Sequence, residues 1–157
     1  MPVAKIVILN WNGAEHLRRF LPSVVAAAPA GVEVMVADNG STDDSLGVLA
    51  TEFPSVGVLR LEANYGFAGG YNRALKQVEA DYYLLLNSDI ETPEGWLAPI
   101  LDVLEREPDV AVVSPKLISW TDRTKFEYAG ASGGFIDFLG YPFCRGRILR
   151  QVETDEG

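Results

Sequence analysis

The sequence has little cysteine, little histidine and few positive charges. Its 157 residues include one cysteine and one histidine. This excludes a framework of intramolecular disulfides and gives no sign of a cysteine–histidine metal site. The 13 lysine and arginine residues are outnumbered by 22 acidic residues, which gives a net charge of −9. An acidic chain is a poor ligand for phosphate backbones and anionic lipid, so we expect no nucleic-acid partner.

Long hydrophobic runs are also missing. The most apolar stretch, residues 82–86, is far shorter than the roughly 18 residues that indicate a membrane-spanning helix. The N-terminal residues lack the charged start and apolar stretch of a signal peptide. Because a lone cysteine also fits a reducing compartment, we expect a cytoplasmic protein. Apolar residues make up 48% of the chain and charged residues 22%, which excludes bulk disorder.

What is present is a regular alternation of apolar runs and amphipathic segments. The apolar runs predict strands at residues 6–9, 32–37, 56–61, 82–86 and 110–113. Helices are predicted at residues 15–28, after the segment Ser41–Asp44, at 67–78 and at 92–106, with Ser41 and Thr92 as expected N-caps. This order predicts an α/β fold with a mostly parallel sheet covered on both faces. Residues 121–157 break the pattern and are expected to form irregular and short antiparallel pieces.

Polar side chains follow each of the first four predicted strands. They are Asn10-Trp11-Asn12, Asp38-Asn39, Glu62-Ala63-Asn64 and Asn87-Ser88-Asp89. Because ligands of parallel sheets bind beyond the carboxyl ends of the strands, these residues predict a shared site. An extended chain would place Asn87 and Asp89 on one face, where their oxygens would suit Mg²⁺ or Mn²⁺ on a diphosphate. An Asx turn that only ends the strand is the alternative.

Two other features have both a ligand-binding and a purely structural interpretation. Asp38 could accept a hydrogen bond from a base or ribose, or it could only stabilise the turn that it begins. The glycine-rich loop 64–70 has neither the Gly-x-Gly-x-x-Gly pattern nor the lysine of a Walker sequence. Its glycines also suit close packing of a helix on the sheet. A dehydrogenase or a P-loop enzyme is therefore disfavoured.

Four segments of the chain resemble, in order and spacing, the sequence blocks of inverting family 2 glycosyltransferases. They are Val7–Gly13, Val36–Asp43, Asn64–Asn72 and Leu85–Asp89. The resemblance covers roughly residues 3–118 and is strongest to the bacterial rhamnosyltransferase-like branch. It implies the GT-A fold, a Rossmann-like nucleotide-diphospho-sugar transferase fold. Residues 1–120 would be the donor-binding domain, and residues 121–157 the start of an acceptor-side region that is apparently truncated at the C-terminus.

The resemblance also implies roles for individual residues. The donor would be bound by Asn10, Trp11, Asn12, Asp38, Asn64, Gly66, Phe67, Asn72, Asn87 and Ser88. Asp38 would hydrogen-bond uracil or thymine, and Asp89 would engage Mg²⁺ or Mn²⁺, which stabilises the departing nucleoside diphosphate. Asn87 stands where many members have aspartate, so it keeps an oxygen ligand and removes a charge. The general base is expected downstream of the chain end.

The implied activity is transfer of a sugar, with inversion, from a UDP- or dTDP-sugar to a hydroxyl of a glycan or lipid-linked glycan. Bacterial surface polysaccharide synthesis, peripheral at the inner face of the membrane, would be its setting. The alternative is a nucleotide-binding fragment or inactive relative that binds the nucleoside diphosphate without catalysis. A nucleotidyltransferase would need a basic loop near the N-terminus, and residues 10–13 contain no lysine or arginine. A truncated domain would expose apolar surface, so homo-oligomers are a further expectation.

Overall fold

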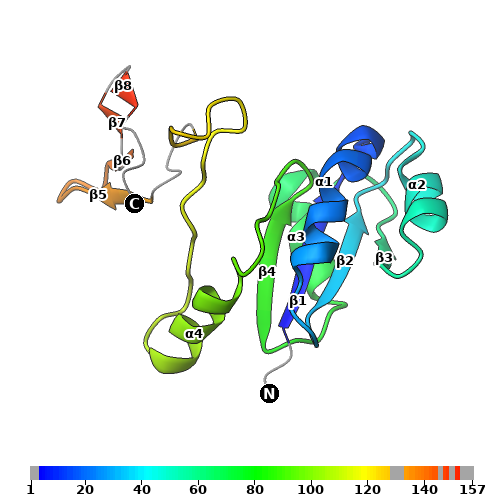
Figure 1. Ribbon diagram of the computed structural model, residues 1–157, viewed down its shortest axis with the longest axis horizontal. Helices are drawn as coiled ribbons and strands as arrows, with labels where there is room; N and C mark the ends of the chain where they lie inside the picture. The colour runs from blue at the N-terminus through cyan, green and yellow to red at the C-terminus, as the bar shows by residue number, and fades with distance from the viewer. Residues whose placement is uncertain (1–3, 128–132, 145–146, 149–150, 153–157) are drawn as a thin grey trace. The chain divides into compact units, whose positions relative to one another are not determined.

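Four parallel strands form the centre of the first part of the chain (Figure 1). The computed structural model describes residues 4–127, 133–144, 147–148 and 151–152. In chain order the first elements are β1 (Ala4–Asn10), α1 (Ala14–Ala27), β2 (Glu33–Asp38), α2 (Ser45–Glu52), β3 (Gly57–Arg60), α3 (Gly66–Leu75) and β4 (Tyr82–Asn87). The strands lie in the order β3-β2-β1-β4, and every neighbouring pair is parallel.

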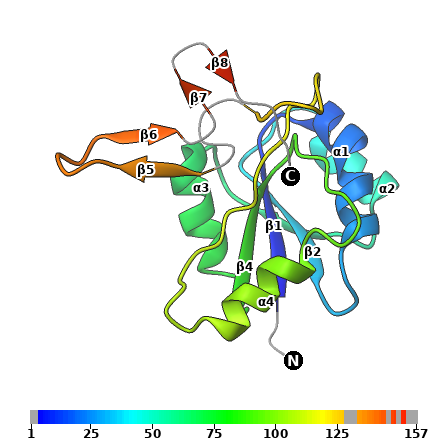
Figure 2. The same ribbon diagram turned by 60° about the vertical axis from the view of Figure 1, so that its left-hand side comes forward.

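The middle strand β1 is buried on both faces of the sheet. Ile6 and Ile8 point to one face and Val7 to the other, and all three are buried. This is why β1 consists of a continuous apolar run rather than alternating apolar and polar residues. Figure 2 shows the two layers that cover the sheet, with α3 on one side and with α1 and α2 on the other.

Each covering helix contributes an apolar stripe. The buried residues of α1 are Ala14, Leu17, Phe20, Leu21 and Val24, at the three- and four-residue spacing of one helix face. On the opposite face of the sheet, Tyr71, Ala74 and Val78 form a buried cluster with Val7 and Ala37. The two sides of the sheet thus have separate apolar layers, as the sequence pattern predicted.

Two predicted elements differ from the structure. The helix expected from Thr92 begins only at Ala98, as α4 (Ala98–Arg106). The reason is that Gly95 has a φ of 74°, outside the helical region, while the Thr92 N–H donates to Ser23 Oγ at 3.2 Å. Thr92 is therefore tied to α1 and is not an N-cap.

The strand predicted at residues 110–113 is wrong. This segment has no strand assignment, and Val112 is 83% exposed. The physical reason is that β-propensity acts through paired neighbours, and among the described residues the segment pairs with none. The sheet of the described chain therefore has four parallel strands where five were predicted.

The chain forms two compact units, Met1–Ala98 and Pro99–Gly157. In the second unit β5 (Gly134–Ile136) pairs antiparallel with β6 (Pro142–Cys144), and β7 (Arg147–Ile148) with β8 (Gln151–Val152). Short antiparallel pieces were predicted here and are confirmed for the described residues; the tail 153–157 lies outside them. None of the helices in the described ranges is both long and apolar enough to span a bilayer.

Candidate functional site

The register of the sheet brings the predicted polar residues to one edge. Asn10 at the end of β1 pairs with Asp38 at the end of β2. On the other side of β1, Leu9 pairs with Asn87 at the end of β4. Because all four strands are parallel, these ends face the same way, and three predicted residues lie on adjacent strands.

A buried polar network joins the ends of β1 and β2. Asp38 is 2% exposed, and each of its carboxylate oxygens accepts a hydrogen bond. Asn10 Nδ2 donates to Oδ1 at 3.2 Å, and the Ser41 N–H donates to Oδ2 at 3.0 Å. Asn10 Nδ2 also lies 3.3 Å from Ser41 Oγ. Folding therefore fixes Asp38 in place before any ligand arrives.

Asn10 and Gly13 fit closely together. Asn10 is fully buried, and its Oδ1 has no hydrogen-bond partner among the described residues. A Cβ added to Gly13 would collide with that oxygen and would come within 3.7 Å of Ser88 Oγ. A glycine is thus required where the first loop passes over the end of β1, and Ser88 of the fourth strand end lies close by.

The loop after β1 is fastened to the loop after β2 through Asn12. Asn12 has a φ of 50°, in the left-handed region. Its Oδ1 accepts from the Thr42 N–H at 2.7 Å and from the Asp43 N–H at 3.3 Å, and its own N–H donates to Ser41 Oγ at 2.9 Å. Ser41 thus serves the contacts between the two loops, and the predicted N-cap role for it is wrong, because α2 begins four residues later at Ser45.

Asp43 anchors the beginnings of two helices. Its Oδ2 accepts from the Ala14 N–H at 3.0 Å, at the start of α1. Its Oδ1 accepts from the Ser45 N–H at 3.0 Å and from the Ser45 hydroxyl, at the start of α2. Partial burial opposes ionisation of the carboxyl, but the hydrogen bonds from Ser45 and Ala14 outweigh it and lower the pKa of Asp43.

Asn39 holds the loop that leads into α3. It is buried, and its Nδ2 donates to Asn64 Oδ1 at 3.0 Å and to the Gly66 carbonyl at 3.1 Å. Its Oδ1 accepts from the Tyr65 N–H at 3.1 Å. Asn64 Oδ1 also accepts from the Gly66 N–H at 2.9 Å. The predicted site residues Asn64 and Gly66 are therefore held against the end of β2.

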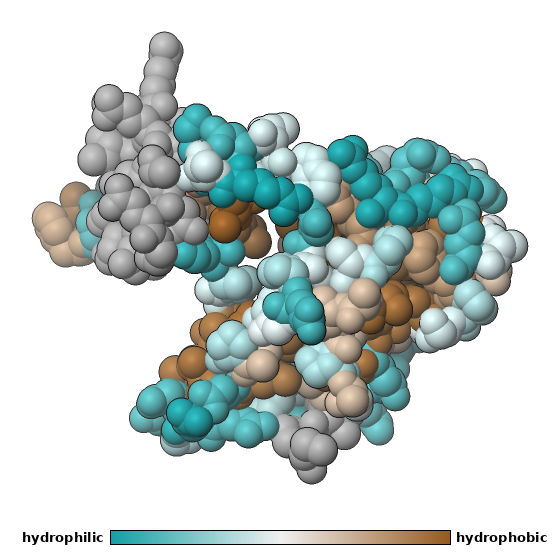
Figure 3. Space-filling view, in the orientation of Figure 1, coloured by the Kyte–Doolittle hydropathy of each residue, from teal (hydrophilic) through white to brown (hydrophobic). Residues whose placement is uncertain are grey.

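Exposed aromatic side chains border this network. Trp11 and Phe67 are 55% and 65% exposed. Figure 3 shows one face of the molecule, on which hydrophobic and hydrophilic side chains are interspersed. Asn72 is exposed on α3, and its side chain makes no hydrogen bond within the described part of the chain. Trp11 and Phe67 thus lie beside the network by their place in the chain, whereas Asn72 is not joined to it.

The end of β4 is open. The strand ends at Asn87, and Ser88 and Asp89 form a turn. The alternation that was expected to place Asn87 and Asp89 on one face therefore does not extend to Asp89. Asn87 and Asp89 are exposed, and among described residues the side chains of Asn87, Ser88 and Asp89 make no hydrogen bond or ion pair.

This open turn is where a divalent ion would fit. No group of three or more histidine, cysteine or acidic side chains is gathered within the described residues. Asp89 and Asn87 offer one carboxylate and one amide group, and neither side chain has a hydrogen-bonding partner in the part of the chain that the structure describes. Mg²⁺ is commonly held by one or two carboxylates together with substrate phosphates. The donor set therefore fits an ion that arrives with a nucleotide and does not fit a cage built from protein alone.

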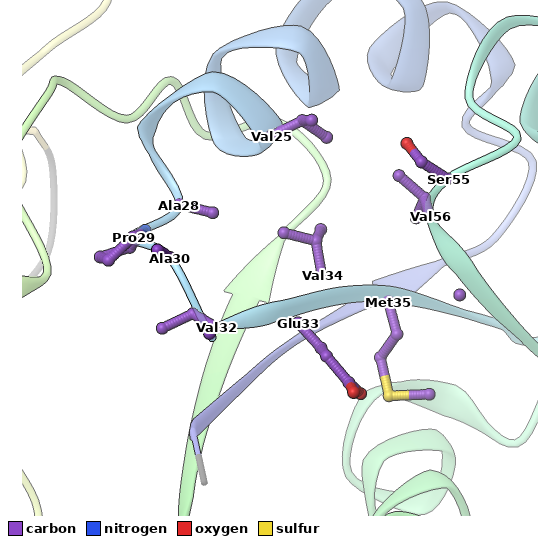
Figure 4. A pocket seen from close by; sticks show the side chains of 12 residues that line it. Val25, Ala28, Pro29, Ala30, Val32, Glu33, Val34, Met35, Ser55 and Val56 are labelled. Carbon is purple, nitrogen blue, oxygen red and sulfur yellow. The ribbon is translucent and has the colours of Figure 1, made fainter. Parts of the chain in front are cut away.

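A pocket of about 610 Å³ lies at the other end of the sheet. Its lining includes Val25 at the end of α1, Glu33 and Val34 at the start of β2, and Val56 and Gly57 before and at the start of β3 (Figure 4). Because these are the amino ends of the strands, the pocket is separate from the polar edge. It contains none of the predicted site residues.

A parallel sheet covered by helices, with polar side chains at the carboxyl ends of its strands, is typical of α/β proteins that bind a ligand at that edge. The chain matches Glycosyl transferase family 2 over residues 5–150 and belongs to that family. The predicted membership is therefore confirmed. The chain is 29% identical over 124 residues to N-acetylglucosaminyl-diphospho-decaprenol L-rhamnosyltransferase of Mycobacterium tuberculosis. That match covers 72% of this chain and 40% of the relative, so the chain spans about two-fifths of that relative's length.

Solved structures support the same fold. The mannosyltransferase PcManGT from Pyrobaculum calidifontis, in complex with GDP-Man and Mn²⁺, matches with a TM-score of 0.63 and 20% identity. That match covers 74% of this chain and 36% of the other. Staphylococcus aureus TarS 1-349, in complex with UDP-GlcNAc, matches with a TM-score of 0.58 and 22% identity over 74% and 38% of the two chains. The predicted α/β GT-A fold is confirmed.

Sequence reasoning missed two residues that build the site. Ser41 and Asp43 make hydrogen bonds across the loops, and neither was among the predicted site residues. Asn39 was expected at the shared edge, but no role was assigned to it. The signal for Ser41 and Asp43 was their position, because both lie in the block Val36–Asp43 that carried the resemblance. They contact Asn12 and Ala14, which lie 29 residues away in the chain, so local pattern alone could not assign these contacts.

Proposed function

We propose that this chain is the donor-binding part of a glycosyltransferase that moves a sugar from a nucleotide-diphosphate donor to an acceptor hydroxyl. The observation that carries the proposal is the buried network at the ends of β1–β3, next to the open turn at the end of β4. Family membership and the names of the relatives support it. The Mycobacterium relative is named a rhamnosyltransferase, and the Pyrobaculum structure contains GDP-Man and Mn²⁺.

The two sides of the site suit the two ends of a nucleoside diphosphate. We assign the base and ribose of a UDP- or dTDP-sugar to the Asp38 side, and the diphosphate to Asn87–Asp89. Asp38 on β2 and Asn87 on β4 flank β1. Two strand spacings separate their backbones by roughly 10 Å, a span comparable with that from a base through its ribose to the phosphates.

The proposed reaction is a single displacement with inversion. The acceptor oxygen attacks the anomeric carbon on the face opposite the diphosphate, whose bond to that carbon breaks. The acceptor proton passes to a general base, which we assign to no described residue. A bound Mg²⁺ or Mn²⁺, held by Asp89 and Asn87, would supply charge neutralisation for the departing diphosphate. Trp11 and Phe67 are proposed to border the donor, and Asn72 to reach it from α3.

The name of one relative supports a proposal for the acceptor and the setting. We propose a glycan or lipid-linked glycan acceptor, because the Mycobacterium relative is named for a diphospho-decaprenol acceptor. The enzyme would then work in the cytoplasm, at the inner face of the membrane, in surface polysaccharide synthesis. Residues 1–120 would carry donor binding and residues 121–157 the beginning of the acceptor side.

Calorimetric titration of the chain with UDP, dTDP and GDP tests the proposal. Each titration is run with Mn²⁺ and repeated with EDTA. We expect binding of UDP or dTDP that weakens at least tenfold when the metal is removed. Binding of none of the three nucleotides would contradict the proposal. A sugar-transfer assay is then run with a nucleotide-sugar donor that contains the nucleotide found to bind. This assay distinguishes an enzyme from the alternative, a relative that binds the nucleoside diphosphate without catalysis.

A further inference from the structure

Tyr71 is a buried tyrosine on α3 whose hydroxyl lies against the end of the β1–β4 pair. It is 4% exposed. Its hydroxyl donates to the Leu86 carbonyl at 2.9 Å and accepts from the Leu9 N–H at 3.4 Å, and the Val7 carbonyl lies at 3.4 Å. Burial raises the pKa of the hydroxyl against the opposing effect of the Leu9 N–H, so the group keeps its proton at neutral pH.

The backbone groups that Tyr71 contacts lie next to site residues on two strands. Leu9 immediately precedes Asn10 on β1, and Leu86 immediately precedes Asn87 on β4. The hydroxyl therefore bridges the backbones of β1 and β4, one residue before Asn10 and one residue before Asn87. Its hydrogen bonds go to backbone groups, so they fix the path of the strands themselves.

The ring of Tyr71 contacts a third part of the site. The Phe67 ring packs edge-on against it, with the ring centroids 5.1 Å apart. The helix that carries both rings lies very close to the sheet, because a Cβ at Gly70 would come within 3.0 Å of the Leu9 side chain and of Asn39 Nδ2. A small shift of α3 would therefore be transmitted to Leu9, Asn39 and Phe67 together.

We propose that Tyr71 is a positioning residue that sets the distance between the loop at the start of α3 and the turn Asn87–Asp89. One nucleoside diphosphate can then contact both at once. This inference rests on the proposed function and adds to it a residue that touches neither donor nor metal. The hydroxyl acts through Leu86 and the ring through Phe67.

Tyr83, which is 41% exposed, provides a control on the same sheet that loses the same oxygen. Its hydroxyl donates to the Val78 carbonyl at 2.9 Å and accepts from the Ala80 N–H at 3.2 Å. Tyr71→Phe and Tyr83→Phe therefore remove the same oxygen and the same kinds of backbone hydrogen bond. Tyr83 lies near the start of β4, at the end of the strand away from Asn87.

The first measurement is calorimetric titration of wild type, Tyr71→Phe and Tyr83→Phe with UDP and dTDP, in Mn²⁺ and in EDTA. Loss of the hydroxyl's hydrogen bonds to Leu86 and Leu9 predicts roughly three- to tenfold weaker binding by Tyr71→Phe in Mn²⁺. In EDTA the change should be below twofold, because the turn at Asn87–Asp89 then contributes little. Equal affinities for Tyr71→Phe and wild type in Mn²⁺, or equal losses in both phenylalanine variants, would overturn the proposal.

The second measurement separates this inference from the proposed function. Amide ¹H–¹⁵N spectra of the three proteins are compared without nucleotide. Tyr71→Phe should shift the amide signals of Phe67 and of Ser88 and Asp89, whereas Tyr83→Phe should leave them in place. If wild type binds no nucleotide, the proposed function fails, and these spectra still decide the role of Tyr71. Shifts confined to Leu9 and Leu86 would overturn it.

Discussion

The carboxyl edge of the sheet has two unlike sides. At the ends of β1 and β2, Asp38 and Asn39 are buried and every oxygen of the Asp38 carboxylate already accepts a hydrogen bond. At the end of β4, Asn87 and Asp89 are exposed, and their side chains make no hydrogen bond or ion pair within the described residues. The comparison teaches that folding already engages both oxygens of the Asp38 carboxylate on one side and leaves the other side with exposed oxygen atoms available to a ligand.

This difference should appear in how substitutions act. A group that folding has already engaged contributes to the free energy of unfolding and to binding together. An exposed group without partners contributes only when its ligand is present. Four experiments, from the largest expected effect to the smallest, examine this contrast.

Asp38→Ala should have the largest effect. It removes the acceptor of Asn10 Nδ2 and of the Ser41 N–H, and we expect the free energy of unfolding to fall by about 2–4 kcal/mol, since an unsatisfied buried donor costs about 1–3 kcal/mol. The Asp38→Ala variant should also lose nucleotide binding. Urea unfolding and calorimetry measure the two effects. Unchanged stability would show that the buried network is not what holds the two loops.

Asp89→Ala should affect binding alone. Stability should stay within about 0.5 kcal/mol of wild type, while affinity for UDP in Mn²⁺ should fall about tenfold, or about 1.4 kcal/mol. Calorimetry with and without EDTA measures the metal-dependent part. Glu94→Ala is the control, because it removes one exposed negative charge from the same unit. A comparable loss of affinity in Glu94→Ala would mean that the net charge of the protein, and not the turn at Asn87–Asp89, governs binding.

Asn39→Asp and Asn64→Asp form a pair that tests which side chain donates and which accepts the hydrogen bond between Asn39 and Asn64. The first removes both donated hydrogen bonds, to Asn64 Oδ1 and the Gly66 carbonyl, and should cost about 1–2 kcal/mol. The second keeps an oxygen where Asn64 accepts its hydrogen bonds and should change stability by less than about 0.5 kcal/mol. Urea unfolding measures both. Equal effects would contradict the assigned direction of these hydrogen bonds.

The smallest expected effect is a pH dependence from Asp43. Its pKa is lower in the folded protein than the unperturbed value of 3.8, so its contribution is complete above that value and is lost as pH falls through the folded pKa. We expect Asp43→Asn to be about 0.5–1 kcal/mol less stable at pH 7. Unfolding at stepped pH should show this difference shrinking below pH 3.8. A difference that stays constant to low pH would contradict the assignment.

Sequence predicted the four strands of the parallel sheet and missed the boundaries that distant contacts decide. The runs at 6–9, 32–37, 56–61 and 82–86 correspond to β1–β4. Burial on both faces explains the continuous apolar run of β1, whereas the residues of β3 and β4 are half-buried or exposed. Thr92 has a typical N-cap sequence, but its N–H bonds to Ser23, a residue 69 positions away. No local pattern can anticipate such a partner.

The candidate site was predictable in position more than in detail. Polar residues after parallel strands indicated the edge, and the register confirms that Asn10, Asp38 and Asn87 end adjacent strands. The hydrogen bonds of Asn12 and Asn64 were not predictable, because they depend on how loops cross in space. The binding roles of these residues stay predictions.

The left-handed backbone at Asn12 has a consequence for sequence variation. Residues other than glycine rarely adopt a φ near 50°, and asparagine and aspartate are the common exceptions. Glycine would accept the backbone but would leave the Thr42 N–H without its side-chain acceptor. Two independent demands thus meet at a position whose side chain is exposed. Surface positions usually tolerate many amino acids, whereas a library randomised at this position should return chiefly asparagine and aspartate.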